Sequence, residues 1–176
     1  MMQLLLTSTG RTKLFPGNMQ LFLPLLLCFV TAFASAQSQA TSLDQFLTDQ
    51  HNAHPEITGL LPVEQLISGV QRVIYAEEGS VKIFGANPVC LQTTAQQAAS
   101  VPALGLPVEH VELLTVKIKS QGDLSHHLDL SAFTDFPALK YIHVLSETAL
   151  PASALSSYVI NVPAGASVFY STQLTN

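Results

Sequence analysis

One apolar pattern recurs along the sequence, and its spacing constrains the fold more than any other feature. The pattern apolar-x-x-apolar-x-apolar occupies residues 111–116 and returns 28 residues later, at 139–144. A weaker third copy at 163–168 follows after a further 24 residues. Periods of about 20 to 29 residues are typical of repeat architectures in which each unit gives one strand to a continuous sheet. The spacing therefore predicts stacked strands in a small, mainly parallel sheet.

Residues 128–144, LDLSAFTDFPALKYIHV, carry a more specific pattern. They resemble a leucine-rich repeat, with L-x-L-S, an irregular stretch and then P-x-L-x-x-I-x-V. The resemblance covers residues 108–170 and implies an α/β fold, a short leucine-rich-repeat-like solenoid. The asparagine that usually follows the strand in that family is absent, and Ser131 and Ser146 stand near its place. The whole chain is also similar to short secreted proteins of unknown function from Bacteroidetes-type bacteria, which implies no activity.

The beginning of the chain predicts a secretory signal peptide. Residues 21–34, LFLPLLLCFVTAFA, are almost wholly apolar, follow Arg11 and Lys13, and run into a small-x-small stretch that ends at Ala36. A signal core needs about 7 to 15 apolar residues, whereas a membrane-spanning helix needs about 20. A retained anchor is the alternative, but Pro24 interrupts the segment. We expect residues 1–36 to be cleaved and residues 37–176 to form a single repeat-like domain, exported to the periplasm or the extracellular space.

The charge of the remaining chain argues against several classes of partner. Twelve acidic and five basic residues follow residue 36, a formal net charge of −7. Nucleic-acid binding needs clustered Lys and Arg, and only Lys117 and Lys119 lie close together. We therefore expect no nucleic-acid partner, and no membrane insertion after signal cleavage. Cys90 is the one cysteine left, and its apolar neighbours favour a buried, inert thiol over a reactive one or an intermolecular bridge.

Three stretches have clear local signals. Ser42 and Gln45 form a potential capping box for a helix over residues 43–54, which Pro55 should end and which would cap one end of the sheet. Residues 70–84 contain two β-rich runs separated by four residues with a glycine, which predicts a hairpin or, alternatively, two successive strands of the same sheet. Residues 91–100, rich in Ala, Gln and Thr, predict a short helix.

Histidine pairs are the only suggestion of a metal site. His51 and His54 have the spacing of two imidazoles on one side of a helix, while His126 and His127 are adjacent and should diverge. Zinc sites need three or four ligands. We expect solvated polar residues here, no metal site and no cofactor.

The alternation within residues 113–119 assigns the two faces of the central strand. Leu114, Val116 and Ile118 should point inward, because alternate residues of a strand face opposite sides. With offsets of 28 and 24, Ser167 would lie beside His143 and Thr115 on the outward side, and Phe169 beside Leu145. The candidate binding residues on this outward face are Thr115, Lys117, Tyr141, His143, Leu145 and Phe169.

These observations favour a secreted, non-catalytic binding or interaction module over an enzyme. Repeat proteins that this chain resembles use the outward sheet face, and exposed aromatic side chains there are typical interface anchors. The partner would be a protein or a surface glycan. A small exported hydrolase around His143 is the alternative, although no carboxylate and no nucleophile turn align with it. A structural subunit of an exported assembly is a third interpretation. The strand over residues 166–171 is the expected free edge, through which the chain would pair with a second copy or another protein.

Overall fold

The computed structural model describes residues 40–174. The chain divides into two units, residues 1–36 and 37–176, and the described residues belong to the second. The predicted signal peptide lies outside the described residues. Among residues 40–174, no helix is long and apolar enough to cross a membrane.

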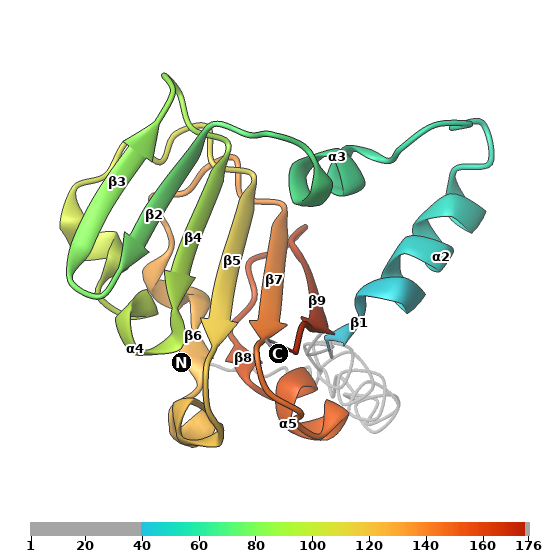
Figure 1. The fold of residues 1–176 in the computed structure, drawn as a ribbon. Coiled ribbons are helices and arrows are strands. Elements are labelled where there is room, and N and C mark those ends of the chain that lie inside the picture. The colour runs from blue at the N-terminus through green and yellow to red at the C-terminus, as the bar shows by residue number, and fades with distance from the viewer. Residues whose placement is uncertain (1–39, 175–176) are drawn as a thin grey trace, which may run out of the picture. The chain divides into compact units, whose positions relative to one another are not determined.

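The main sheet has seven strands in the order β1-β9-β7-β5-β4-β2-β3 (Figure 1). Every neighbouring pair is parallel except β2 and β3. The prediction of an α/β fold with a mainly parallel sheet is confirmed. The strands are β1 (Thr41–Ser42), β2 (Val73–Glu77), β3 (Ser80–Phe84), β4 (Cys90–Thr94), β5 (Leu113–Ile118), β7 (Tyr141–Ser146) and β9 (Ser167–Thr172).

The register agrees with one of the two predicted offsets. Leu114 pairs with Ile142, an offset of 28 as predicted. Ile142 pairs with Val168, an offset of 26, so the predicted 24 is wrong by two residues. The third copy was the weakest, and nothing local distinguishes these two registers. A shift of two preserves the face that each side chain occupies, because the side-chain period of a strand is two.

The connections between successive parallel strands from β4 to β9 pack on the inner face of the sheet. Their apolar side chains join Leu114, Val116 and Ile142 in one core, in which these three strand residues are fully buried. The predicted inward side of β5 is thus confirmed. The connecting elements are α4 (Ala95–Ala98), α5 (Ala152–Ser156), three short 3₁₀ helices (Val101–Leu104, Gln121–Ser125 and Leu130–Ala132), and β6 (Leu128–Asp129) with β8 (Val159–Ile160), which form a two-stranded parallel sheet.

The segment over residues 70–84 forms the predicted hairpin and also joins the parallel sheet. Glu78 and Gly79 have φ of 52° and 73°, so they form the tight two-residue turn that matches strand twist. β2 then pairs with β3 on one side and with β4 on the other. The predicted helix over 91–100 is wrong in its first half, which is β4. Leu91 and Thr93 are fully buried there, so tertiary pairing overrides local propensity.

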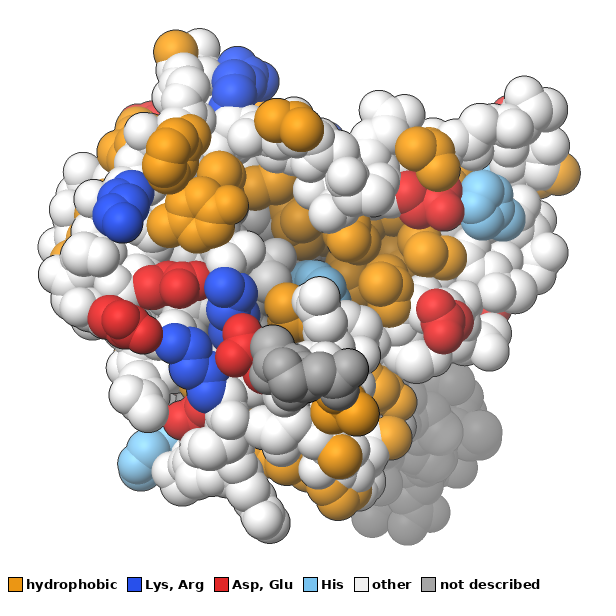
Figure 2. All heavy atoms as spheres, viewed as in Figure 1, with side chains coloured by type: hydrophobic (Ala, Val, Ile, Leu, Met, Phe, Trp, Pro, Cys, Tyr) orange, Lys and Arg blue, Asp and Glu red, His pale blue; other side chains and the backbone are white. Residues whose placement is uncertain are grey.

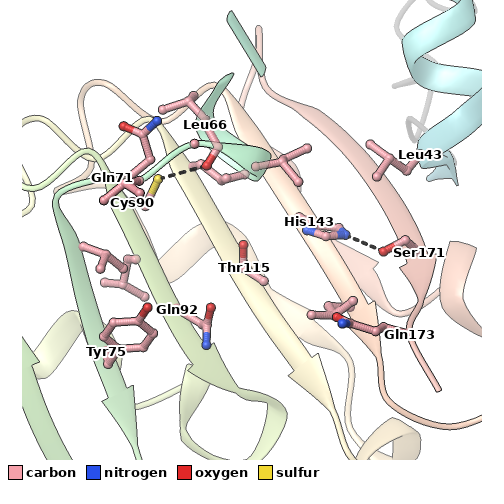
Figure 3. Close-up of a pocket in the computed structure, with 17 residues that line it drawn as sticks. Leu43, Leu66, Gln71, Tyr75, Cys90, Gln92, Thr115, His143, Ser171 and Gln173 are labelled. Atoms are coloured by element: carbon pink, nitrogen blue, oxygen red, sulfur yellow. Dashed lines mark hydrogen bonds between the residues drawn. The ribbon is translucent and has the colours of Figure 1, made fainter. Parts of the chain in front are cut away.

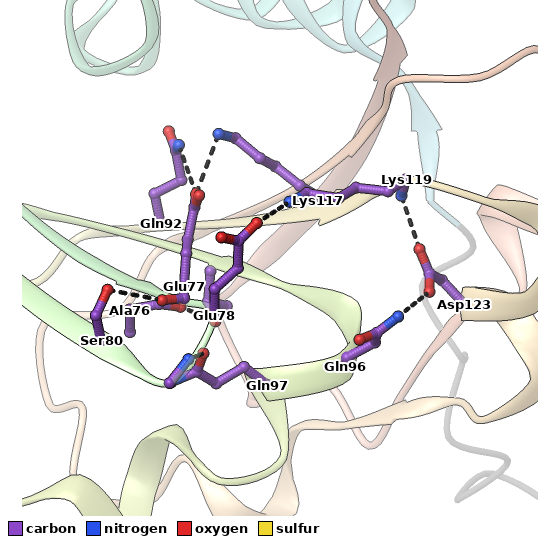
Figure 4. Close-up of polar contacts among 12 residues, drawn as sticks. Ala76, Glu77, Glu78, Ser80, Gln92, Gln96, Gln97, Lys117, Lys119 and Asp123 are labelled. Carbon is purple, nitrogen blue, oxygen red and sulfur yellow. Dashed lines mark hydrogen bonds and ion pairs between the residues drawn. The ribbon is translucent and has the colours of Figure 1, made fainter.

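The turn of this hairpin is held by polar contacts to α4 and to the carboxyl end of β5 (Figure 4). Lys117 lies 3.1 Å from Glu77 and Lys119 lies 3.0 Å from Glu78. Gln97 accepts a hydrogen bond from the backbone N–H of Gly79 at 3.0 Å. These contacts hold the carboxyl ends of β2 and β5 together.

The N-terminal part of the domain lies over the outward face. The helix α2 (Leu43–Ala53) begins at Ser42, whose hydroxyl accepts from the Gln45 N–H at 3.3 Å, and it ends before Pro55 as predicted. The Gln45 side chain bonds Asp49 instead of completing the capping box. A second helix, α3 (Pro62–Ser68), leads to β2. Both helices pack on the outward face in a second core.

The prediction of a free edge at residues 166–171 is wrong. β1 pairs with β9, where Thr41 lies opposite Phe169, and α2 follows immediately. The N-terminal helix therefore lies beside the last strand of the sheet. Among the described residues, the two edge strands of the sheet are the two-residue β1 and, at the other end, the five-residue β3 (Figure 1).

Candidate functional site

The outward face is built from three rows of side chains that run across the parallel strands. The upper row contains Val73, Cys90, Leu113 and Tyr141, and α2 and α3 cover it. Cys90 is buried, as predicted, and its Sγ lies 3.7 Å from the Leu66 carbonyl oxygen. Burial raises the pKa of its thiol to about 11. The thiol therefore stays protonated at neutral pH, where it is a poor nucleophile.

The middle row is uncharged and polar. Tyr75, Gln92, Thr115 and His143 occupy matching positions on β2, β4, β5 and β7, and Phe169 continues the row on β9. Figure 3 shows Gln92, Thr115 and His143 side by side on adjacent strands. Each of these three side chains offers both donor and acceptor capacity to a ligand.

His143 is the one histidine in the row, and it is held neutral. Its ring is 5 % exposed and lies 5.2 Å from the Phe169 ring, centroid to centroid. Burial lowers the pKa of His143 to about 4. Its Nε2 lies 2.8 Å from the Ser171 hydroxyl oxygen. At neutral pH the imidazole thus acts as a hydrogen-bonding group without charge.

The lower row contains charges that neutralise one another. Lys117 and Glu77 form an ion pair, and Gln92 donates to the same Glu77 oxygen at 3.0 Å. Burial alone would raise the pKa of Glu77, but the hydrogen bonds from Gln92 and Lys117 outweigh it and lower the pKa below its usual value. Neither charge is left free to recognise a charged ligand.

A cleft of about 700 Å³ opens over the middle row, below the helices. Figure 2 shows the hollow between apolar side chains and the charged lower row. None of the lining residues is Asp, Glu, Lys or Arg. The hydrogen-bonding side chains are Gln71, Tyr75, Gln92, Thr115, His143, Ser171 and Gln173, and large apolar ones are Leu43, Leu66, Ile67, Val70, Val73 and Leu145.

The structure brings three of the six predicted binding residues into this cleft, namely Thr115, His143 and Leu145. Lys117 lies at its lower border in the ion pair. Tyr141 is half-buried, with its ring edge-on to Phe46 at 6.3 Å between centroids.

Phe169 is on the predicted face, but it is not exposed. Its ring stacks on Phe46 of α2 at 4.7 Å and is completely buried. The prediction of an exposed anchor is wrong because α2 covers this part of the face. The register correction also changes its row, since Phe169 lies opposite His143 and Ser171 opposite Leu145.

Five of the seven hydrogen-bonding side chains of the cleft were not predicted from the sequence, namely Gln71, Tyr75, Gln92, Ser171 and Gln173. Gln92 was hidden by the wrong helix prediction, and Ser171 by the register error. Tyr75 lies in the predicted hairpin, where no face was assigned to it; it faces outward, and its inward neighbours are Ile74 and Ala76. The one signal for Tyr75 was its position two residues before Glu77, since residues two apart in a strand share a face. Gln71 and Gln173 lie just outside β2 and β9, and no local pattern in the sequence points to them.

The histidine pairs do not gather further ligands. His51 contacts Glu64 at 3.2 Å and His54 contacts Glu56 at 3.2 Å. Within residues 40–174, no group of three or more metal-ligating side chains occurs.

Comparisons with protein-family models, with curated proteins and with solved structures gave no match.

Proposed function

We propose that this chain is an exported, non-catalytic binding module whose outward cleft holds a neutral saccharide of a surface glycan. The observation that carries the proposal is the composition of the cleft, in which no lining residue bears a formal charge. An ionic ligand would lose its hydration there without gaining a counter-charge. An uncharged ligand with both hydrogen-bonding and apolar surface matches the lining.

A saccharide fits this chemistry in two respects. Its hydroxyl groups each donate and accept, as do the amide of Gln92, the hydroxyl of Thr115 and the neutral pair of His143 and Ser171 taken together. The C–H face of a sugar ring packs on aromatic and apolar side chains, which Tyr75 and Leu145 supply. The cleft volume lies within the range of about 300 to 1,000 Å³ that small-ligand sites occupy.

The scaffold of this module is, in our proposal, a short leucine-rich-repeat-like solenoid. The parallel strands follow one another in sequence order from β2 to β9, and their connections pack on one face. A doubly wound sheet would place connections on both faces. Ser146, near the place of the family's asparagine, is fully buried and donates to the Thr148 carbonyl at 2.7 Å.

Binding can be tested with neutral oligosaccharides by isothermal titration calorimetry. Thr115→Val keeps the volume of the side chain and removes its hydroxyl, so affinity should fall by about fivefold, the equivalent of one hydrogen bond. Thr134→Val, at an exposed position outside the cleft, is the matched control. Preferential binding of anionic oligosaccharides, or equal affinity of both variants and the wild type, would contradict the proposal.

Export is a separate part of the proposal and has its own test. N-terminal sequencing of protein recovered from outside the cytoplasm should give Gln37 as the first residue. Recovery with Met1 or Met19 at the terminus would refute cleavage after Ala36.

An esterase centred on His143 is the second candidate, favoured by the 2.8 Å contact between His143 and Ser171. The lowered pKa makes this imidazole a weak base, and no carboxylate among the described residues bonds its ring. A panel of simple esters would decide. Turnover that disappears in Ser171→Ala would support the hydrolase, and turnover no faster than buffer would eliminate it.

A further inference from the structure

The edge strand β3 is a second candidate interaction site, at the end of the sheet that α2 and α3 do not cover. All five of its residues are exposed, with Val81, Ile83 and Phe84 at 40 %, 46 % and 54 %. No described strand pairs with its outer side. Unpaired backbone groups beside apolar side chains form a template onto which another strand can add.

The hairpin register determines which backbone groups of β3 bond to β2 and which point away from the sheet, beyond its edge. Ser80 lies opposite Glu77 next to the two-residue turn, so these two residues exchange backbone hydrogen bonds. Along an antiparallel pair, hydrogen-bonded pairs alternate with pairs that are not hydrogen-bonded to each other. Lys82 consequently bonds back to β2, whereas the N–H and C=O groups of Val81 and Ile83 point away from the sheet. An added strand would bond to these two residues.

Lys82 lies between Val81 and Ile83 and supplies the charge of this edge. The structure describes four lysines, and Lys117, Lys119 and Lys140 each contact a glutamate. Among the described residues, no carboxylate lies within ion-pair distance of Lys82. A hollow of about 350 Å³ adjoins Lys82 and Phe84 on the outward side and leaves room for an incoming side chain. Glu77 and Glu78 also line this hollow, but each is paired with a lysine of its own, so Lys82 carries the charge without a counter-charge.

A second copy of this chain does not complement the edge in the register that would pair both Val81 and Ile83 with β3 residues of the other copy. In the antiparallel register centred on Lys82, Val81 of each copy would pair with Ile83 of the other, and the two lysines would face each other. Like charges directly opposite are destabilising. A lysine at the middle of an edge strand is also a recognised obstacle to self-pairing.

We propose that β3 docks an extended segment of another protein, which adds antiparallel as a further strand and presents an acidic residue between two apolar residues. The acidic residue would lie opposite Lys82 on the outward face. Its two neighbours would lie beside Val81 and Ile83 on the other face, where they cover exposed apolar surface. This docking edge is independent of the cleft.

The test uses two blocked pentapeptides, TVEVT and TVKVT, titrated into the isotopically labelled full chain and followed by amide NMR shifts. TVEVT should shift the amides of Val81 and Ile83, and TVKVT should bind about fivefold more weakly, as expected for one cross-strand ion pair. Lys82→Glu should reverse this order. Ile83→Pro should abolish binding, because proline removes an outward N–H.

Four results would overturn the proposal. They are equal binding of the two peptides to the wild type, no binding of TVEVT up to its solubility limit, shifts confined to residues outside β3, and wild-type dimers in light scattering that Ile83→Pro dissociates. Circular dichroism of Ile83→Pro controls for folding. If that variant is unfolded, the charge reversal at Lys82 still decides, since it leaves the backbone unchanged.

Discussion

Two phenylalanines lie on the same face at opposite ends of the main sheet, in very different surroundings. Phe169 on β9 is 0 % exposed and stacks on Phe46, whereas Phe84 on β3 is 54 % exposed and lies edge-on to Tyr75, at 5.8 Å between ring centroids. The β9 end is closed by β1 and α2, and the β3 end is open. The same face of the sheet therefore contributes to a core at the β9 end and to the exposed surface at the β3 end.

The difference shows that covering helices decide what a sheet face does. Where α2 and α3 reach, the upper row becomes a second core. Where they stop, the middle row lines a cleft, and beyond β2 nothing described covers the sheet. Four substitutions or pairs of substitutions test this contrast.

Truncation of the two phenylalanines should give the largest contrast. Phe169→Ala should lower the free energy of unfolding by about 3–5 kcal/mol, because it leaves a cavity beneath α2. Phe84→Ala should lower it by less than about 1 kcal/mol, since much of that ring stays in water. Urea unfolding measures both. Similar losses would show that the β3 end is covered as well.

Acidification should weaken the closed end through His143. Its pKa is about 4 in the folded chain, against an ordinary value of 6.5, so below pH 6.5 the unfolded chain binds a proton that the folded chain does not. Stability should fall by about 3 kcal/mol as the pH falls from 6.5 to 4.

The window from pH 7 to 5 isolates this effect, because the pKa values of Glu77 and Asp123 are lowered and these groups titrate at lower pH. Thermal melts across it should show a flatter dependence for His143→Gln than for the wild type. His126→Gln, at an exposed position, is the control and should keep the wild-type slope. An unchanged slope in His143→Gln would show that His143 is not buried in neutral form.

A proline pair tests the open edge. Lys82→Pro should destabilise the chain by about 1–3 kcal/mol, because its N–H bonds to the Tyr75 carbonyl of β2, which would lose its partner, and because proline distorts the strand. Ile83→Pro should cost less, since its N–H points away from the sheet. Chemical unfolding compares them. The opposite order would mean that the hairpin register is wrong or that another segment pairs with β3.

The smallest expected effect is at the helix cap of the closed end. Ser42→Ala removes the acceptor for the Gln45 N–H and should cost about 1 kcal/mol. Ser125→Ala, at an exposed position without a cap bond, should change the melting temperature little. Equal melting temperatures for both variants and the wild type would show that this cap does not hold α2 in place.

Local pattern was sufficient for several elements of the fold. The alternation of Leu114, Val116 and Ile118 fixed the inward side of β5, and the 28-residue offset placed Ile142 beside Leu114. The cap at Ser42 and the glycine turn at Gly79 predicted a helix and a hairpin, and both formed. These features depend on side chains close in sequence or on a strong repeat, so the sequence by itself determined them.

Long-range packing decided the rest. The register of β9 and the strand at Gln92 depend on pairing with distant strands, for which the sequence offers competing alternatives of similar local quality. The position of α2 depends on where Phe46 finds an apolar surface, and it found Phe169. That contact buries one predicted binding residue, and the end of the helical cover leaves Thr115 and His143 to line the cleft. Only the tertiary structure decided this division of the sheet face, because a strand's alternation says which side a residue occupies but not what will cover it.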